Sequence, residues 1–170
     1  MKYAGMAFVV ISTASVGLQM SVALRNRCKL LRQLLSALQI LRNEISVCGT
    51  PLPQAFALMA VASRGSVEQL FAAIAREMDN RRWLTPVSAM ELALQNNRVM
   101  MQDDHICCIL RQFASGLGKY DKDRQLQTID MAANELSALL RHTEEDHSAH
   151  GKSYKLLGVC AGLSLVILLA

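Results

Sequence analysis

Residues 29–49 read KLLRQLLSALQILRNEISVCG, and this apolar pattern sets the structural class of the chain. Its hydrophobic residues recur at steps of three and four, the spacing of a helix that buries one face. The expected buried face comprises Leu31, Leu34, Leu35, Leu38, Leu41, Ile45 and Cys48. Gly49 stands where helices often end in left-handed backbone, so we expect the helix to stop there.

Two further helices are predicted directly downstream. Thr50 followed by Pro51 indicates an N-cap with proline in the first helical position, so residues 52–63 should form the second helix. Ser66, with Gln69 three residues later, has the spacing of a capping box that opens a third helix. The expected buried face of that helix comprises Val67, Leu70, Phe71, Ile74 and Met78.

A polar turn at residues 80–83 separates the third helix from the fourth. Thr85 and the proline after it repeat the capping signal, and the fourth helix should run to about Leu94. Residues 95–98 are polar and are predicted to form another loop.

Acidic residues mark the start of the remaining two helices of the middle region. Asp103 and Asp104 favour a helix N-terminus through the helix dipole, and Gly116 and Gly118 should end that helix. Its buried face is expected to comprise Ile106, Ile109, Leu110, Phe113 and Leu117. Asp121 is placed to cap the last helix, whose expected packing seam comprises Leu126, Ile129, Ala133, Leu136 and Leu140. Because no strand alternation appears, the predicted fold is all-α, an antiparallel bundle of about six helices.

The two ends of the chain differ from its middle because they are almost uncharged. Tyr3 to Leu24 holds 22 residues without a charge, and a helix of that length spans ~33 Å, enough for a hydrocarbon core of ~30 Å. Leu156 to Ala170 has only 15 uncharged residues. This segment crosses the membrane only if the side chains of flanking residues extend to the interface and the bilayer adapts its thickness. We therefore predict anchors at 1–24 and 153–170, with a helical domain at 25–152 between them.

Basic residues flank both predicted anchors on the side of the middle region. Arg25, Arg27, Lys29 and Arg32 follow the first apolar stretch, and Lys152 and Lys155 adjoin the second. Such residues mark the cytoplasmic side, so the middle should be cytoplasmic and both termini should face outward. A cleaved signal peptide is the alternative, because Ser21-Val22-Ala23 resembles a cleavage site.

Charge and cysteine content narrow the function. Between Arg42 and Asp146 there are 11 Lys plus Arg against 14 Asp plus Glu, so the net charge of +4 is concentrated beside the apolar ends. A nucleic-acid partner is therefore not expected. Five cysteines without the spacing of a disulfide framework fit reduced thiols in a cytoplasmic domain.

The sequence contains only weak matches to catalytic, metal-binding and phosphate-binding motifs. Asp104 and His105 precede Cys107 and Cys108 by about one helical turn, a conceivable metal-binding face, and His105 with Cys108 is the one local nucleophile and base pair. A second conceivable metal stretch contains His142, His147 and His150. The Gly151-Lys152-Ser153 tripeptide lacks the earlier glycine of a phosphate-binding loop. We expect no catalytic residue, cofactor or metal, with an exported or membrane-tethered helical enzyme or metal-binding protein as the alternative.

Three segments together resemble the stage III sporulation protein AB family. Arg25 to Ala60 (RNRCKLLRQLLSALQILRNEISVCGTPLPQAFALMA) is the most specific, above all around Thr50, Pro51 and Leu52. Phe113 to Gln125 (FASGLGKYDKDRQ) is similar to that family's leucine-glycine, aspartate and glutamine stretch. The apolar C-terminal residues are similar to its anchor, so the resemblance covers nearly the whole chain.

The resemblance implies a noncatalytic membrane component of the channel between mother cell and forespore. That component is similar to the platform protein of type II secretion. The implied location is the mother-cell membrane that faces the forespore. Expected partners are a secretion-type ATPase, stage III sporulation protein AA, and the other stage III A channel proteins, and the chain would couple the ATPase to membrane components.

Charged residues at the ends of the bundle are the candidate partner contacts. They are Glu44, Arg81, Arg82, Asp103, Asp104, Lys119, Asp121, Lys122 and Arg124. Reversing the charges of Arg81 and Arg82 should weaken capture of the ATPase. Gly158 and Gly162 form a G-x-x-x-G pair in the last apolar stretch, where close helix packing would support a homo-oligomer.

Overall fold

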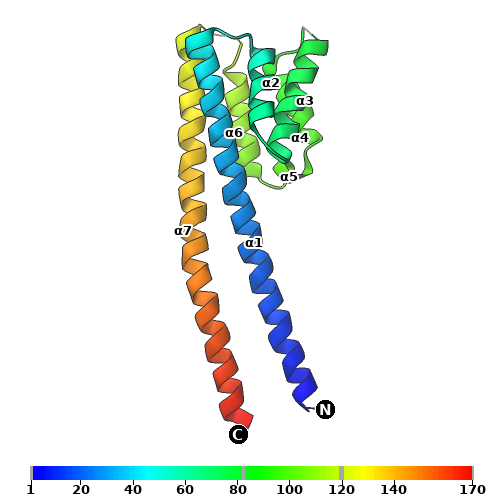
Figure 1. Cartoon of the computed structure of the whole chain (residues 1–170), viewed down its shortest axis with the longest axis vertical. Coiled ribbons are helices and arrows are strands. Elements are labelled where there is room, and N and C mark those ends of the chain that lie inside the picture. Colours follow the sequence, from blue (N-terminus) through cyan, green and yellow to red (C-terminus); the bar gives the residue numbers. More distant parts are fainter. Residues whose placement is uncertain (1, 82, 119–120, 170) are drawn as a thin grey trace. The chain divides into compact units, whose positions relative to one another are not determined.

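A computed structural model of the 170-residue chain describes the backbone of residues 2–81, 83–118 and 121–169, and the side chains of residues 22–81, 83–118 and 121–146. The described backbone is all-α, which confirms the predicted class (Figure 1). Its elements are α1 (Lys2–Asn43), the π-helical turn η1 (Glu44–Cys48), α2 (Leu52–Ala62), α3 (Ser66–Asn80), α4 (Pro86–Gln95), α5 (Arg98–Met101), α6 (Asp104–Ser115) and α7 (Lys122–Leu169).

The predicted membrane anchors fall almost wholly outside the residues whose side chains are described. Within the described side-chain ranges, no helix is long and apolar enough to cross a membrane. The predicted anchors at 1–24 and 153–170 share with those ranges only residues 22–24. Both anchors therefore stay predictions.

The chain divides into two compact units. One joins residues 1–29 to residues 140–170, and the other is Leu30–Leu139. The second unit contains α2 to α6 together with the last part of α1 and the first part of α7. All candidate partner contacts before the last apolar stretch belong to this bundle.

The end of α1 supplies one wall of the bundle core. Leu31, Leu34, Leu38 and Leu41 are at most 1% exposed, as their spacing predicts. Cys48, predicted to share their face, is exposed instead. The difference arises because residues 44–48 form a π turn, which has more residues per turn than an α-helix and rotates the following side chains away from the core.

α2 and α3 form an antiparallel pair in the bundle. Phe56 and Phe71 are fully buried, and their rings stack with centroids 6.1 Å apart. The predicted buried face of α3 is confirmed in full. Burying large aromatic side chains of this kind provides much of the stability of a small core.

Two predicted caps on these helices are wrong. Pro51 occupies the N-cap of α2, and the Thr50 hydroxyl donates a 2.6 Å hydrogen bond to the Glu44 carboxylate instead of accepting from the helix. Ser66 is the first residue of α3 and Gly65 is its N-cap, so the capping box with Gln69 does not form. Gly65 has φ 63°, which favours glycine at this position.

α4 and α6 begin as their capping signals predict. The Thr85 hydroxyl accepts a hydrogen bond from the Ser88 amide, and Asp103 Oδ1 accepts one from the Ile106 amide, both at 3.3 Å. The predicted loop at 95–98 is shorter than expected, because α5 begins at Arg98. The described bundle consequently has one short helix more than the sequence predicts.

α7 opens one residue after Asp121, whose carbonyl oxygen accepts a hydrogen bond from the Gln125 amide at 3.1 Å. Ile129 and Leu136 are buried, as predicted. The other predicted seam residues, Leu126, Ala133 and Leu140, are half-buried, and Ala132 is buried in their place. The core-facing line of α7 is thus rotated slightly from the predicted one.

Candidate functional site

One end of the bundle, which we call the hairpin end, gathers the end of α1 and the starts of α2, α4 and α7. Lys122 Nζ donates a 2.7 Å hydrogen bond to the carbonyl oxygen of Ser46. A Cβ placed on Gly118 would lie 3.3 Å from the Pro86 side chain and 3.6 Å from that of Leu52. Gly118 has φ 77°, so glycine suits both the conformation and the close approach.

Glu44 contributes to the structure of the hairpin end. Its carboxylate accepts the 2.6 Å hydrogen bond from the Thr50 hydroxyl. Its backbone carbonyl oxygen accepts hydrogen bonds from the backbone amides of Gly49 and Thr50. Gly49 adopts left-handed backbone at φ 63°, so the predicted end of the first helical segment is confirmed. These bonds fix the exit of the chain from α1.

The other charged candidates at this end are exposed to solvent. Arg81 pairs with Glu77 at 3.7 Å, and its side chain is 52% exposed. Such a pair holds the arginine only weakly, because water screens it. Arg82 and Lys119 lie outside the described residues, whereas Asp121, Lys122 and Arg124 are exposed.

Asp103 and Asp104 lie at the opposite end of the bundle, which we call the Asn97 end. There the Asn97 side chain donates a 2.7 Å hydrogen bond to the Ser66 carbonyl oxygen, joining the start of α5 to the start of α3. Asp103 is engaged as the N-cap of α6, and Asp104 is exposed. The charged candidates that the structure describes therefore do not share one surface.

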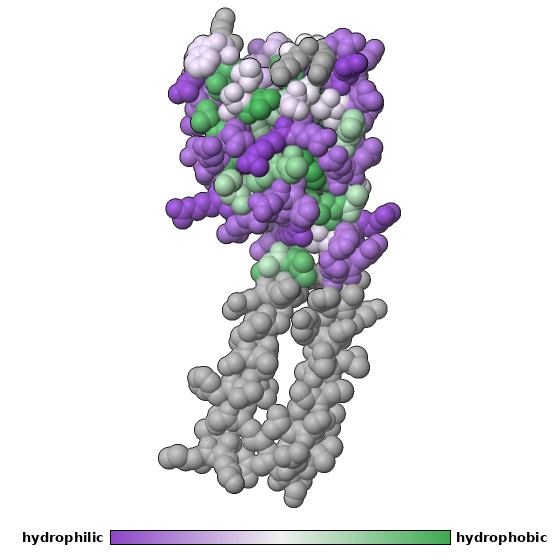
Figure 2. Space-filling model, turned by 180° about the vertical axis from the view of Figure 1, so that it is seen from behind, coloured by the Kyte–Doolittle hydropathy of each residue, from purple (hydrophilic) through white to green (hydrophobic). Residues whose placement is uncertain are grey.

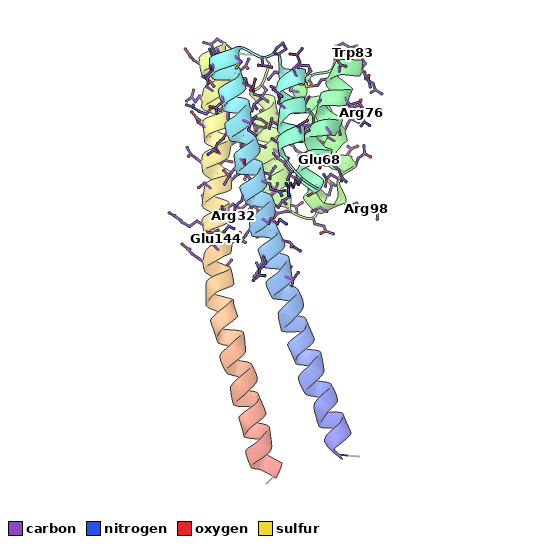
Figure 3. The ribbon with its side chains drawn as sticks, viewed as in Figure 1. Arg32, Glu68, Arg76, Trp83, Arg98 and Glu144 are labelled. Atoms are coloured by element: carbon purple, nitrogen blue, oxygen red, sulfur yellow. The ribbon has the colours of Figure 1, made fainter. Side chains whose placement is uncertain are left out.

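Trp83, predicted to be part of a polar turn, is a prominent feature of the surface. The side chain is 78% exposed, and Figure 3 shows it at the hairpin end, beyond the end of α3. The signal available in the sequence was the single tryptophan of the chain, placed directly after two arginines. Tryptophan and arginine are the residues most enriched among energetically important interface contacts.

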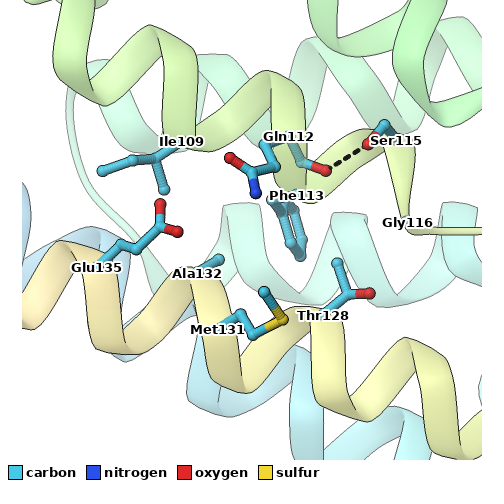
Figure 4. Close-up of a pocket in the computed structure, with 9 residues that line it drawn as sticks. All are labelled: Ile109, Gln112, Phe113, Ser115, Gly116, Thr128, Met131, Ala132 and Glu135. Carbon is cyan, nitrogen blue, oxygen red and sulfur yellow. Dashed lines mark hydrogen bonds between the residues drawn. The ribbon is translucent and has the colours of Figure 1, made fainter.

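α6 and α7 enclose a half-open groove of about 170 Å³ (Figure 4). Ile109 and Phe113 line it from α6, and Thr128 and Met131 line it from α7. A Cβ on Gly116 would lie only 2.5 Å from Thr128 side-chain atoms, so this glycine permits the close approach of the two helices beside the groove. Figure 2 shows one face of the molecule, on which hydrophobic residues reach the surface between hydrophilic ones.

The cysteine pair of α6 is divided between core and surface. Cys107 is 2% exposed and its thiol donates a 3.1 Å hydrogen bond to the Met100 carbonyl oxygen, whereas Cys108 is exposed. Burial raises the pKa of the Cys107 thiol, and the nearby Arg111 guanidinium opposes that rise only in part. The two thiols point to different environments, so they do not act as one predicted ligand face.

The remaining predicted ligand stretches are partly outside the described residues. His142 Nδ1 lies 3.1 Å from Asp146 Oδ2, an exposed pair one helical turn apart. Among the residues that the structure describes, no group of three or more His, Cys, Asp or Glu is placed to hold a metal ion. His147, His150, the 151–153 tripeptide, Gly158 and Gly162 lie beyond the described side chains.

Comparison with known proteins gives a consistent result over the whole chain. The family model for stage III sporulation protein AB matches residues 2–170. The stage III sporulation protein AB of Bacillus subtilis (strain 168) is 30% identical over 172 aligned residues, which cover 99% of each chain. A solved structure of a stage III sporulation protein AB is similar with a TM-score of 0.65 and 28% identity, over 72% of this chain and 97% of that one.

Proposed function

Because the chain belongs to the stage III sporulation protein AB family, we propose that it is a noncatalytic platform component of the channel between mother cell and forespore. In this role the helical bundle binds a secretion-type ATPase, stage III sporulation protein AA, and the apolar ends hold the chain in the mother-cell membrane beside the other stage III A proteins. The family name denotes a sporulation protein and indicates no reaction.

The observation that carries the proposal is the continuity of the first and last helices. α1 is one helix from Lys2 to Asn43 and α7 is one helix from Lys122 to Leu169. Each contributes buried residues to the Leu30–Leu139 bundle and also contains a terminal stretch free of charged residues. A partner bound to the bundle is therefore connected to both predicted anchors through unbroken helical backbone.

Thiol labelling tests the membrane topology on which the proposal depends. Cys48 and Cys108 are exposed in the bundle, and Cys107 is a buried internal control. In sporulating cells, a membrane-impermeant maleimide should label the exposed pair only after permeabilisation and Cys107 only after unfolding. Labelling of Cys48 or Cys108 in intact cells would place the bundle outside and favour the exported alternative.

The hairpin end is the proposed ATPase contact. The chain enters the bundle at Leu30 and leaves it at Leu139, whereas the hairpin end is formed where α1 finishes and α7 begins. Its exposed charges include Arg81, Asp121, Lys122 and Arg124. Charges on an accessible rim accelerate association and select the partner more than they add affinity.

Charge reversal tests this contact. Membranes that carry the Arg81→Glu/Arg82→Glu chain should capture the purified ATPase several-fold more slowly at low salt than wild-type membranes, and a Lys122→Glu/Arg124→Glu chain should show the same direction. The matched control is Arg64→Glu/Arg98→Glu, the same charge change at exposed residues near the Asn97 end. Equal capture by all variants with unchanged helicity would remove the hairpin end as the ATPase contact.

A further inference from the structure

Trp83 is presented on a short, internally bonded turn. The Leu84 amide donates a 2.8 Å hydrogen bond to the Arg81 carbonyl oxygen, and the capped start of α4 follows at Thr85. Trp83 lies between these two bonded residues, and its indole is 78% exposed. A tryptophan side chain has only two rotatable side-chain torsions, so it loses little conformational freedom when a partner covers it.

The groove between α6 and α7 is large enough for the six-membered ring of an aromatic side chain. Its volume of about 170 Å³ is close to that of an apolar cavity of ~150 Å³ that binds benzene. Apolar atoms of Ile109, Phe113 and Met131 line it (Figure 4). Met131 is 49% exposed, and the flexible thioether of methionine adapts to the shape of an inserted ring.

Charge and hydrogen-bonding groups on the two surfaces are complementary. Gln112 on α6 and Glu135 on α7 stand at the groove, and within the described residues neither side chain has a hydrogen-bond or ion-pair partner. Among the residues that the structure describes, the Arg81 side chain, two residues before Trp83, pairs only with Glu77, at 3.7 Å. An indole N–H can donate a hydrogen bond to the amide oxygen of Gln112, and a guanidinium can pair with the carboxylate of Glu135.

The two surfaces lie on different sides of the Leu30–Leu139 bundle. α7 is at one side of the bundle and Trp83, at the end of α3, is at the other (Figures 1 and 3). One chain therefore does not bring its own tryptophan into its own groove. We propose that Trp83 of one chain inserts into the α6–α7 groove of a second copy, with Arg81 of the first chain facing Glu135 of the second.

This contact is head-to-tail, because two different surfaces meet. An open assembly of this kind has one unused groove at one end and one unused Trp83 at the other, unless the rotation between neighbours closes a ring. The second copy is the chosen occupant because the same molecule supplies both the aromatic group and the groove, with opposite charges beside them. The inference does not require ATPase binding, but it shares Arg81 with the proposed ATPase contact.

Photo-crosslinking tests the contact directly. Trp83 is replaced by p-benzoylphenylalanine, which retains an aromatic group, and this chain is mixed in detergent with an isotopically heavy wild-type chain. Illumination should join residue 83 of the light chain to a heavy peptide that contains Met131 or Ile109. The control places the same photoreactive residue at Val61, which is 85% exposed on α2 and should give no such product.

A charge-swap measurement tests the pairing of Arg81 with Glu135. Self-association is measured by fluorescence transfer between labelled whole chains. Trp83→Ala should weaken it by roughly tenfold or more. Glu135→Arg should weaken it also, and Arg81→Glu added to Glu135→Arg should restore part of the loss. The matched control for truncation is Val61→Ala, which should leave self-association unchanged.

Several results would overturn the proposal. They are absence of heavy-to-light crosslinks with unchanged helicity, crosslinks from one residue 83 to another residue 83, and crosslinks in cells only to the ATPase or to lipid. The thiol labelling and the capture test with Lys122→Glu/Arg124→Glu leave Arg81, Trp83 and the groove unchanged, so failure here and failure of the platform role are distinguishable.

Discussion

The side chain of Asn97 links two helix starts that are 31 residues apart in the chain. Its Nδ2 donates a 2.7 Å hydrogen bond to the Ser66 carbonyl oxygen of α3. Its Oδ1 accepts a 3.2 Å hydrogen bond from the Met100 amide of α5. The residue is only 6% exposed. A buried amide that satisfies both partners is costly to remove, because each partner then loses its bond.

We expect Asn97→Ala to lower the free energy of unfolding by about 2 kcal/mol, the sum of a lost cap and a partly buried carbonyl without its donor. Urea unfolding of the whole chain in a mild detergent, followed by circular dichroism, measures the change. Asn96→Ala is the matched control, because the exposed Asn96 amide bonds only to the Leu92 carbonyl of its own helix. Equal losses in both variants would contradict the bridging role.

Gly116→Ala should destabilise the packing of α6 on α7. A new Cβ would lie 2.5 Å from the Thr128 methyl and hydroxyl groups, although the backbone φ of −89° tolerates alanine. Overpacking of this kind costs about 1–3 kcal/mol. Thr128→Ala removes both crowded atoms, so the double variant should recover most of the loss in a thermal unfolding series. Additive losses would show that the close contact is not the cause.

Cys107 should make the stability of the bundle depend on alkaline pH. Burial raises the pKa of this thiol, so the folded state disfavours the thiolate that the unfolded state forms freely above about pH 8.5. The contribution is complete below that pH and is lost as pH rises through the raised folded pKa. Unfolding free energies measured from pH 7 to 10 should therefore fall less in Cys107→Ala than in the wild type. Cys108→Ala, an exposed neighbour, should leave the wild-type slope.

The ion pair between α1 and α7 should contribute little. Arg42 Nε lies 2.7 Å from Asp130 Oδ1, but the two side chains are 47% and 49% exposed. We expect a coupling energy of about 0.2–1 kcal/mol from a double-mutant cycle with Arg42→Ala and Asp130→Ala, decreasing in high salt. A salt-independent coupling of several kcal/mol would contradict this view of the contact.

Sequence patterns predicted the features that depend on neighbouring residues. The buried face of α3 and the buried Leu31, Leu34, Leu38 and Leu41 of α1 follow from spacing, although Leu35 is half-buried and Cys48 is exposed. The caps at Thr85 and Asp103 require only a side chain and an amide three residues later. Thr50 also has the local capping pattern, but a competing bond to Glu44 takes its hydroxyl. A local capping pattern therefore predicts a cap only where no other side chain competes for the capping hydroxyl.

Features made by distant segments were not predictable in this way. α5 has four residues, too few to show a helical period, and its Asn97 cap is fixed by a bond to α3. The groove requires the packing of α6 against α7 beside Gly116, and the exposure of Trp83 depends on how the turn leaves α3. A single sequence gives the residues of such sites without their placement.

The π turn at Glu44–Cys48 affects how the chain tolerates changes in length. A π turn is an α-helix with one residue accommodated as a local bulge. Loss of one residue from this segment would return the turn to the ordinary helical repeat, and the leucines before it would keep their angular positions. Such a loss would leave the buried leucines of α1 in phase, but the Glu44 bonds to Gly49 and Thr50 would have to form again across a shorter segment.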